Sequence, residues 1–320
     1  MKNQFILAPL LGFVAAVILD CRCVRAQTPP QLSSGASPTL AQPTQVYSPF
    51  IGLQDKYDEW LAMVHRTHEE EQPDWMTPIV TVIPTLQQEI RTDYGFAFAP
   101  HGLQTFTYAS KGTEIIPTEN TEFIFGNPSY ITKNLPADGH TSGFADWPFL
   151  FKYRLLSSPS EAGNYVVTVM LSASFATGST RYVSANHDLF SPLVGFGKGI
   201  VTRYGEFDYQ ATLGPTVPDG ETGKLGTPVA WNSAFQYGNR FHVGGWTVPL
   251  WPEFETTWIA YPNGENRGQQ QLYLTPGIIA GRFRLSEHAY FVLGTGYQFA
   301  ATHARAFNHQ WLVTMRIPYF

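Results

Sequence analysis

From about residue 80 to the C-terminus, apolar and polar side chains alternate with a period of two. In residues 147–155 the odd positions are Trp, Phe, Phe, Tyr and Leu, and two bases, Lys152 and Arg154, lie between them. Residues 165–175 and 205–213 repeat the alternation. Because successive side chains of a strand point to opposite faces, this pattern predicts β-strands with one apolar face rather than helices.

The alternating region divides into twelve predicted strands: 86–98, 103–117, 121–131, 143–157, 163–177, 187–201, 205–217, 227–238, 248–261, 270–285, 288–301 and 307–320. Connections after the even-numbered strands are mostly tight, and several of those after the odd-numbered strands are longer and polar. The stretch 239–247 departs from this rule as a longer connection on the tight side. Short turns at one end and long loops at the other are typical of barrels in the bacterial outer membrane.

Two architectures produce such alternation, a soluble sandwich with an apolar core and a membrane barrel with an apolar outer face. Only 14% of residues are charged and 15% are aromatic, whereas soluble domains are about 25% charged. The chain also stops at Phe320 directly after a predicted strand, as bacterial barrels commonly do. Aromatic residues near strand ends suit the interfacial girdles of a barrel: Tyr94, Trp147, Trp258, Trp311 and Tyr319. We therefore predict an all-β fold, a transmembrane antiparallel up-and-down β-barrel of about twelve strands over residues 80–320.

The N-terminal region predicts export. Lys2 precedes an unbroken apolar run over residues 5–19, and Val24-Arg25-Ala26 forms a cleavage pattern, so residues 1–26 are expected to be a secretory signal peptide. Both cysteines, Cys21 and Cys23, precede this cut, which leaves the mature chain without thiol chemistry. Residues 27–50 are rich in Pro and Ser with almost no charge, a composition typical of a flexible linker.

Residues 51–79 carry the only helical pattern of convincing length, with apolar positions including Tyr57, Trp60 and Val64 at helical spacing. We predict a short amphipathic helix here, either inside the barrel lumen or at its periplasmic base. His65 and His68, with the acidic residues that follow, have the spacing of metal ligands. Such pairs are common on inert surface helices, and we expect neither a metal nor another cofactor.

The net charge argues against a nucleic acid partner. Removal of residues 1–26 takes three bases and one acid from totals of 20 and 25, which leaves a mature net charge of −7. The expected partners are instead outer-membrane lipids and small-molecule solutes.

The strongest candidate functional residues are charges with the parity of the barrel interior: Glu89, Arg91, Asp93, Lys152, Arg154, Glu206, Asp208, Glu253, Glu255, Arg282, Arg284 and Arg316. Fixed charges along a lumen can select solutes in a polar conduit. Because both signs are interleaved along neighbouring strands, they can equally form a structural network that fills the lumen. Both interpretations remain open from the sequence.

Two consecutive predicted strands carry a family resemblance. GFADWPFLFKYRLLSS (143–158) and GNYVVTVMLSASFATGS (163–179) resemble the bacterial outer-membrane proteins assigned to the MetA pathway of phenol degradation, with matches at Lys152–Leu156 and Ala176–Gly178. The preceding segment 113–130 is similar to a hairpin of that family with an acidic turn. Over residues 84–320 the resemblance implies an outer-membrane barrel that passes hydrophobic or aromatic compounds.

A lipid hydrolase is the less favoured enzymatic alternative. His140 and Ser142 are two residues apart, the spacing that places a base and a nucleophile on one strand face, as in outer-membrane phospholipases. Gly143 replaces the Asn that follows the serine there, and the sequence offers no evident partner for the histidine. We expect no catalytic residues. The predicted function is a channel or transporter-like barrel for small molecules in the bacterial outer membrane, with hydrophobic or aromatic solutes implied by the family resemblance and a closed structural barrel as the alternative.

Overall fold

The computed structural model describes residues 51–135, 139–179, 183–243 and 246–319. The predicted signal peptide and linker lie outside the described residues. The helices are α2 (Ile51–Glu69), η1 (Pro100–Gly102) and α3 (Thr222–Leu225). The strands are β1 (Glu89–Phe98), β2 (Gln104–Thr118), β3 (Thr121–Gly126), β4 (Tyr130–Leu135), β5 (Gly139–Phe144), β6 (Trp147–Ser158), β7 (Tyr165–Phe175), β8 (Leu189–Thr202), β9 (Gly205–Pro215), β10 (Val217–Pro218), β11 (Val229–Val243), β12 (Trp246–Ala260), β13 (Gln270–Arg284), β14 (Tyr290–Ala300) and β15 (His309–Pro318).

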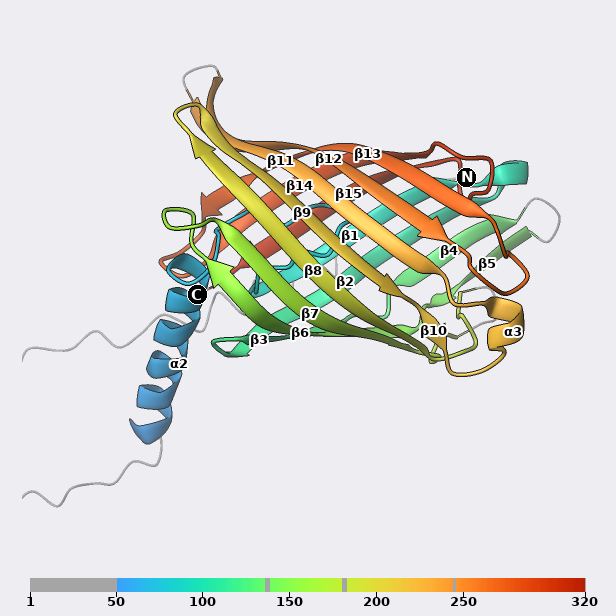
Figure 1. The fold of residues 1–320 in the computed structure, drawn as a ribbon, viewed down its shortest axis with the longest axis horizontal. Coiled ribbons are helices and arrows are strands. Elements are labelled where there is room, and N and C mark those ends of the chain that lie inside the picture. The colour runs from blue at the N-terminus through green and yellow to red at the C-terminus, as the bar shows by residue number, and fades with distance from the viewer. Residues whose placement is uncertain (1–50, 136–138, 180–182, 244–245, 320) are drawn as a thin grey trace, which may run out of the picture. The chain divides into compact units, whose positions relative to one another are not determined.

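The strands close into one antiparallel barrel (Figure 1). Most strands pair with their neighbour along the chain, and β1 pairs with both β2 and the last strand, β15, so the sheet returns to its start. β3 and β4 lie one after the other along β2, β5 and β6 follow one another in the same way, and β10 extends β9. The barrel therefore has twelve spans, and the predicted fold class is confirmed.

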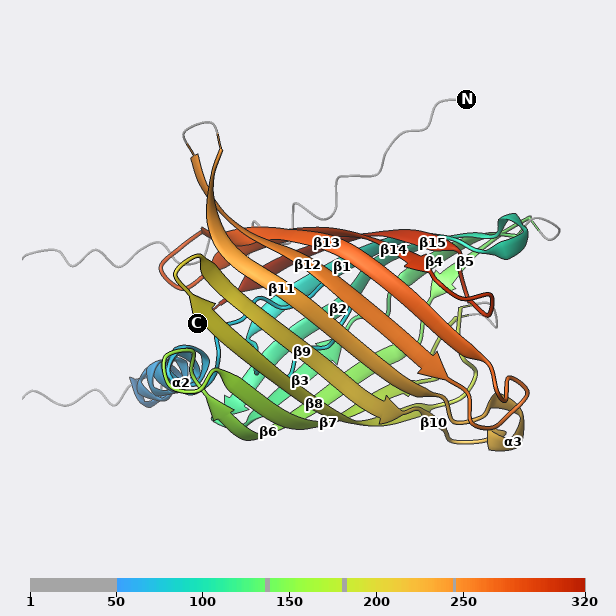
Figure 2. The same cartoon turned by 45° about the horizontal axis from the view of Figure 1, so that its top comes forward.

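The predicted alternation of loop lengths also appears in the structure. Tight turns such as 119–120 and 203–204 lie at the end of the barrel that we call the short-turn end, and the longer connections lie at the loop end. The stretch 239–247, which was expected to be a connection, instead lies largely in strands. β11 runs to Val243 and β12 begins at Trp246, and their hairpin projects beyond the neighbouring strands (Figure 2).

The outer face of the barrel is apolar and aromatic. Phe207, Phe235 and Trp311 are each at least half exposed, and neighbouring strands place rings against one another, as in the pair Tyr297–Trp311 with centroids 4.8 Å apart. A continuous apolar face of this kind is stable only against lipid. In the described part of the chain, none of the helices has the length and apolar character needed to cross a membrane.

Only the C-terminal half of α2 packs on the barrel. Val64 is fully buried against Leu86 and Ile116, and the Trp60 Nε1–H donates to the Ile116 carbonyl at 2.8 Å. Tyr57, on the same predicted apolar stripe, is 53% exposed. The helix thus contacts the short-turn end of the barrel, where β2 ends.

The segment between α2 and β1, residues 70–88, enters the barrel; we call it the lumen segment. Most of its side chains are buried, and Met76 and Ile79 pack against the inward-facing Ile279 and Val292. It contains no regular helix or strand. The hydrophobic core of this protein is therefore inside the barrel and is built around an irregular chain.

The wall of the barrel is irregular along β2 and β3. The β1–β2 register shifts between Asp93 and Gly95, and Ala109 and Lys111 have positive φ of 54° and 80°. A register shift of this kind marks a β-bulge, in which one strand has an extra residue and the side chains around it are redirected. Beside it the backbones approach closely: a Cβ at Gly112 would lie 2.0 Å from the carbonyl oxygen of Phe125.

Substitution of Gly112 should therefore destabilise the barrel. In Gly112→Ala the new methyl group has only backbone to displace, and we expect a loss of about 1–3 kcal/mol in the free energy of unfolding. Gly95→Ala is the matched control, because its Cβ would meet no atom closer than 3.7 Å. Denaturant titration in detergent, with heat-dependent gel mobility as a second readout, measures the difference. Equal midpoints for the two variants would contradict the close approach.

Candidate functional site

Most of the predicted interior charges are buried inside the barrel. Eight of them are less than 9% exposed: Glu89, Arg91, Lys152, Arg154, Asp208, Glu253, Glu255 and Arg316. Asp93 is 13% exposed and forms an ion pair with Arg91 at 2.9 Å. Charges at these positions need partners, because an isolated buried charge is strongly unfavourable.

The carboxylates bind backbone N–H groups of the lumen segment. Glu255 accepts from Val80 at 2.8 Å and from Thr81 at 2.5 Å, one bond on each oxygen. Glu253 accepts from Ile79 at 3.2 Å. Three consecutive amides of an irregular chain are thus satisfied by two side chains of one strand, β12.

The bases bind carbonyl groups of the same segment. Arg91 donates to Ile79 at 2.5 Å, and Lys152 donates to Thr85 at 3.2 Å. Arg316 donates to two successive carbonyls, Thr77 and Pro78. Since buried backbone polar groups require partners, these inward charges replace the hydrogen bonds that a helix or strand would supply.

Acidic partners that the sequence analysis did not single out complete the network. Glu122 forms an ion pair with Lys152 at 2.9 Å and accepts from the Gln87 amide at 2.6 Å. Glu71, at the start of the lumen segment, pairs with Arg154 at 2.7 Å. The alternation in β3 carried a signal for Glu122, because its parity is opposite to that of the outward-facing Phe123 and Phe125. No such signal existed for Glu71.

Asp208 and two further predicted residues, Glu206 and Arg282, lie towards the short-turn end of the barrel. Asp208 accepts from Gln210 at 2.7 Å, and Glu206 accepts from the Asn164 side chain at 2.9 Å. Arg282 forms an ion pair with Asp74 of the lumen segment. A register shift between Gly281 and Phe283, with Arg282 at a φ of 59°, turns its side chain inward.

Arg284 differs from the expectation. It is exposed at the short-turn end of β13, and its Nε–H donates to the Ser286 carbonyl at 3.1 Å. β13 ends at this residue. Arg284 therefore lies beyond the barrel wall, and its parity no longer places it in the lumen.

Glycines on one side of the barrel make room for the lumen segment. A Cβ at Gly197 would lie 2.3 Å from the Trp75 ring, and a Cβ at Gly195 would lie 3.1 Å from Pro84 Cβ. A Cβ at Gly277 would meet Ile79 at 2.9 Å. The lumen segment therefore packs closely against the side of the barrel wall formed by β8 and β13.

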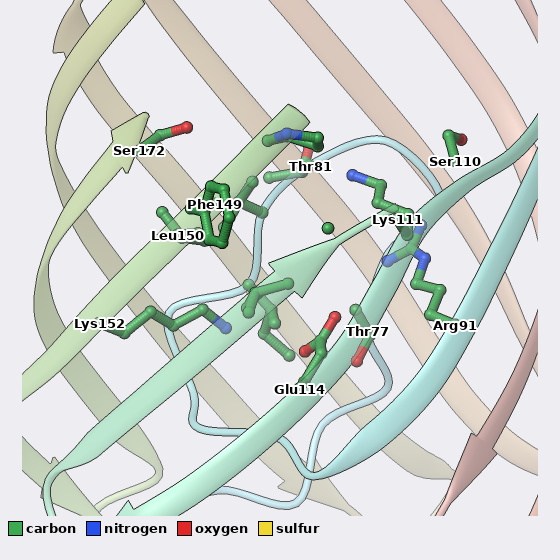
Figure 3. Close-up of a pocket in the computed structure, with 15 residues that line it drawn as sticks. Thr77, Thr81, Arg91, Ser110, Lys111, Glu114, Phe149, Leu150, Lys152 and Ser172 are labelled. Atoms are coloured by element: carbon green, nitrogen blue, oxygen red, sulfur yellow. The ribbon is translucent and has the colours of Figure 1, made fainter. Parts of the chain in front are cut away.

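A cavity of about 350 Å³ remains on the opposite side; we call it the wall cavity (Figure 3). It lies between the lumen segment and the wall formed by β2, β3 and β6, next to the bulge in β2. Its apolar lining includes Val82, Ile83, Ile124, Phe149 and Leu150. Its polar lining includes Arg91, Lys111, Glu114 and Lys152.

A second, more polar hollow of about 660 Å³ lies at the short-turn end. His68, Asp74, Trp75 and Arg282 contribute to its lining. His68 is buried, with its Nε2 3.2 Å from Gln87 Oε1 and its Nδ1 3.6 Å from Asp74 Oδ1. This histidine joins the end of α2 to both ends of the lumen segment.

His65 and His68 do not share a metal site. His65 Nε2 lies 3.4 Å from Glu69 Oε2 on the exposed helix face, whereas His68 points into the hollow. In the described ranges, the acidic and histidine side chains form no group of three that could hold a metal ion.

His140 and Ser142 both lie on β5, close to the loop end. His140 Nδ1 is 3.0 Å from Asn134 Oδ1, so this histidine has an orienting partner that the sequence did not reveal. Ser142 Oγ accepts from the Tyr130 hydroxyl at 3.0 Å. Within the described residues, the hydrogen bonds do not join His140 to Ser142, so the arrangement lacks the contact that activates a serine.

No protein-family model matches the sequence, and no curated protein matches it. Solved structures to which the chain is similar include the following three. For the COG4313 outer membrane channel from Pseudomonas putida F1, the TM-score is 0.48 at 11% identity, over 77% of this chain and 100% of that chain. For the beta domain of the Bordetella autotransporter BrkA, it is 0.43 at 13% identity, over 73% and 98%. For a loop-deletion mutant of OmpT, an outer membrane protein of Vibrio cholerae, it is 0.32 at 8% identity, over 73% and 97%.

Removal of one carboxylate should loosen the lumen segment. Glu255→Ala leaves the buried amides of Val80 and Thr81 without acceptors, at about 1–3 kcal/mol for each unmade bond. A cysteine introduced at Thr81, a position only 1% exposed, should then react with a thiol reagent at least about tenfold faster. Glu265→Ala, at an exposed loop position, is the control. Equal labelling rates in the two backgrounds would show that Glu255 does not hold the segment.

The buried His68 should make stability depend on pH. The pKa of His68 lies below its ordinary value of 6.5 because burial penalises the charged ring, and this effect outweighs the attraction of Asp74. The unfolded chain therefore binds the proton first, so the stabilisation is complete above about pH 7 and falls as the pH drops through about 6.5.

The measurement is the difference in unfolding free energy between the parent and His68→Gln from pH 8 to pH 5. The advantage of the parent should shrink as the pH falls. A difference that stays constant, or that grows towards low pH, would show that the ring is protonated in the folded protein.

Proposed function

We propose that this protein is a bacterial outer-membrane barrel that passes small molecules with apolar surface, and that the lumen segment closes it at rest. The apolar outer face, the twelve antiparallel spans and the predicted export signal support this placement. The resemblance of residues 143–179 to the MetA-pathway family supports solutes with hydrophobic or aromatic character.

The wall cavity is the observation that carries the proposal. A barrel with a purely structural interior has no need of an apolar-lined space of about 350 Å³. That volume lies at the small end of the range for small-molecule sites. It borders the lumen segment along Thr81, Val82 and Ile83, so movement of this segment would extend the cavity along the barrel axis.

A closed structural barrel is the second candidate, and the anchoring of the lumen segment favours it. Ten backbone groups between Met76 and Gln87 are bound by inward side chains, Gln210, Thr168 and Glu122 among them. The two functions differ in one respect: only the transporting barrel requires the lumen segment to move.

A reversible crosslink tests this difference. A Cβ at Gly195 would lie 3.1 Å from Pro84 Cβ, close to the spacing of about 3.5–4.5 Å found in disulfides. Because Cys21 and Cys23 lie in the predicted signal peptide, Pro84→Cys/Gly195→Cys should form a single bridge in the mature chain. Swelling of proteoliposomes in isosmotic phenyl glucoside, compared with arabinose, reports the flux of an aromatic and a non-aromatic solute.

We expect flux of phenyl glucoside to exceed that of arabinose when the bridge is reduced, and to fall to the protein-free rate when it is oxidised. The two single-cysteine variants serve as controls and should not respond to oxidant. Absence of flux in both redox states would favour the closed structural barrel, and equal flux in both would show that the lumen segment does not gate the path.

A further inference from the structure

We propose that the wall cavity binds an amphipathic monoanion, a single ring or short aliphatic body carrying one carboxylate or sulfonate, with its anionic group on Lys111. This inference deepens the proposed function by naming the chemical class of the solute, and it rests on that function only for the role of the cavity in transport.

Lys111 reaches the cavity because of the bulge in β2. Its Cα lies opposite Thr92, and its φ of 80° turns the residue away from the regular alternation of the strand. In Figure 3 the Lys111 side chain points into the cavity, beside Thr81. A positive φ is unusual for a residue with a side chain. The backbone at Lys111 is therefore locally strained in the conformation that directs the ammonium group into the cavity.

The other cations at the cavity already have partners. Arg91 binds Asp93 and the Ile79 carbonyl, and Lys152 binds Glu122 and the Thr85 carbonyl. In the part of the chain that the structure describes, by contrast, no hydrogen bond or ion pair joins the Lys111 ammonium group to another residue. A cation in this position gains most from an anion that enters the cavity, because the low-polarity surroundings strengthen their attraction.

The rest of the lining suits an apolar body. Leu150 and Ile124 of the barrel wall and Val82 and Ile83 of the lumen segment line the cavity, so a ring or short chain would be covered on two sides. Glu114, whose Oε2 is buried and has no hydrogen-bond partner, lies in the same lining. An acidic side chain there is an unfavourable neighbour for a second anionic group, which restricts the class to monoanions.

The bound state is tested on detergent-solubilised protein by titration calorimetry with two probes of similar shape. Benzenesulfonate carries a permanent negative charge, and benzenesulfonamide is its neutral counterpart. We expect benzenesulfonate to bind at least tenfold more tightly to the parent. Lys111→Met, which keeps the length of the side chain without its charge, should bind the two probes equally, and Lys111→Arg should retain the preference.

Lys198→Met is the matched control, because Lys198 is exposed on β8 and donates to the Gly163 carbonyl. It should leave the preference for benzenesulfonate unchanged. Heat-dependent gel mobility checks that each variant is folded. Since Lys111→Met removes a charge without an ionic partner, its denaturation midpoint should equal or exceed that of the parent, so loss of binding cannot be assigned to unfolding.

Equal affinity of the parent for the two probes, or no binding of either at millimolar concentration, would overturn the proposal. The outcome is separable from that of the flux experiment. Lys111-dependent binding without solute flux would keep this site and reject the transporting barrel. Flux of phenyl glucoside without Lys111-dependent binding would do the reverse.

Discussion

The structure depends on one constraint: the backbone of an irregular segment inside a closed barrel must find hydrogen-bond partners that neither water nor a neighbouring strand provides. Residues 70–88 form no helix or strand and so lack regular backbone hydrogen bonds, and the backbone groups of the twelve spans are already paired with one another. The inward charges meet this need. Glu255 accepts from two successive amides, and Arg316 donates to two successive carbonyls. A charged side chain suits this role because its hydrogen bonds are stronger than those of neutral groups.

The same constraint explains which parts of the structure could be predicted from the sequence. Alternation determines which face of a strand a residue occupies, so the strands and the inward position of residues such as Lys152 and Glu253 followed from the pattern alone. Alternation does not reveal what fills the space inside. The three prolines Pro73, Pro78 and Pro84 explain why residues 70–88 form neither a helix nor a long strand. Nothing local indicated that this stretch would thread the barrel, because its partners on the barrel wall are between 12 and 239 residues away in the chain.

Where prediction failed in detail, the cause is a local break in the period of two. Arg284 has interior parity but lies where the wall ends, and Arg282 faces inward through a bulge that shifts the register. Lys111 was not singled out, because in a regular strand it would lie on the face opposite to that of Ser110 and Gly112. It reaches the interior through a positive φ, which the surrounding sequence does not predict. Bulges re-aim side chains, and here they turn two bases, Lys111 and Arg282, towards the interior.

The lumen segment contacts opposite sides of the barrel wall in different ways. On β8 and β13, glycines remove side chains so that Trp75, Pro84 and Ile79 can lie against the backbone. On β2, β3 and β6, the segment is held at a distance by longer groups such as Lys152 and Glu122, and the wall cavity occupies the space between. Close packing on one side and charged contacts on the other mean that the segment need not leave the barrel to enlarge the cavity. A shift that moves Pro84 away from Gly195 and loosens the contacts on the cavity side would be sufficient, and it would disturb fewer of the buried hydrogen bonds than expulsion of the whole segment.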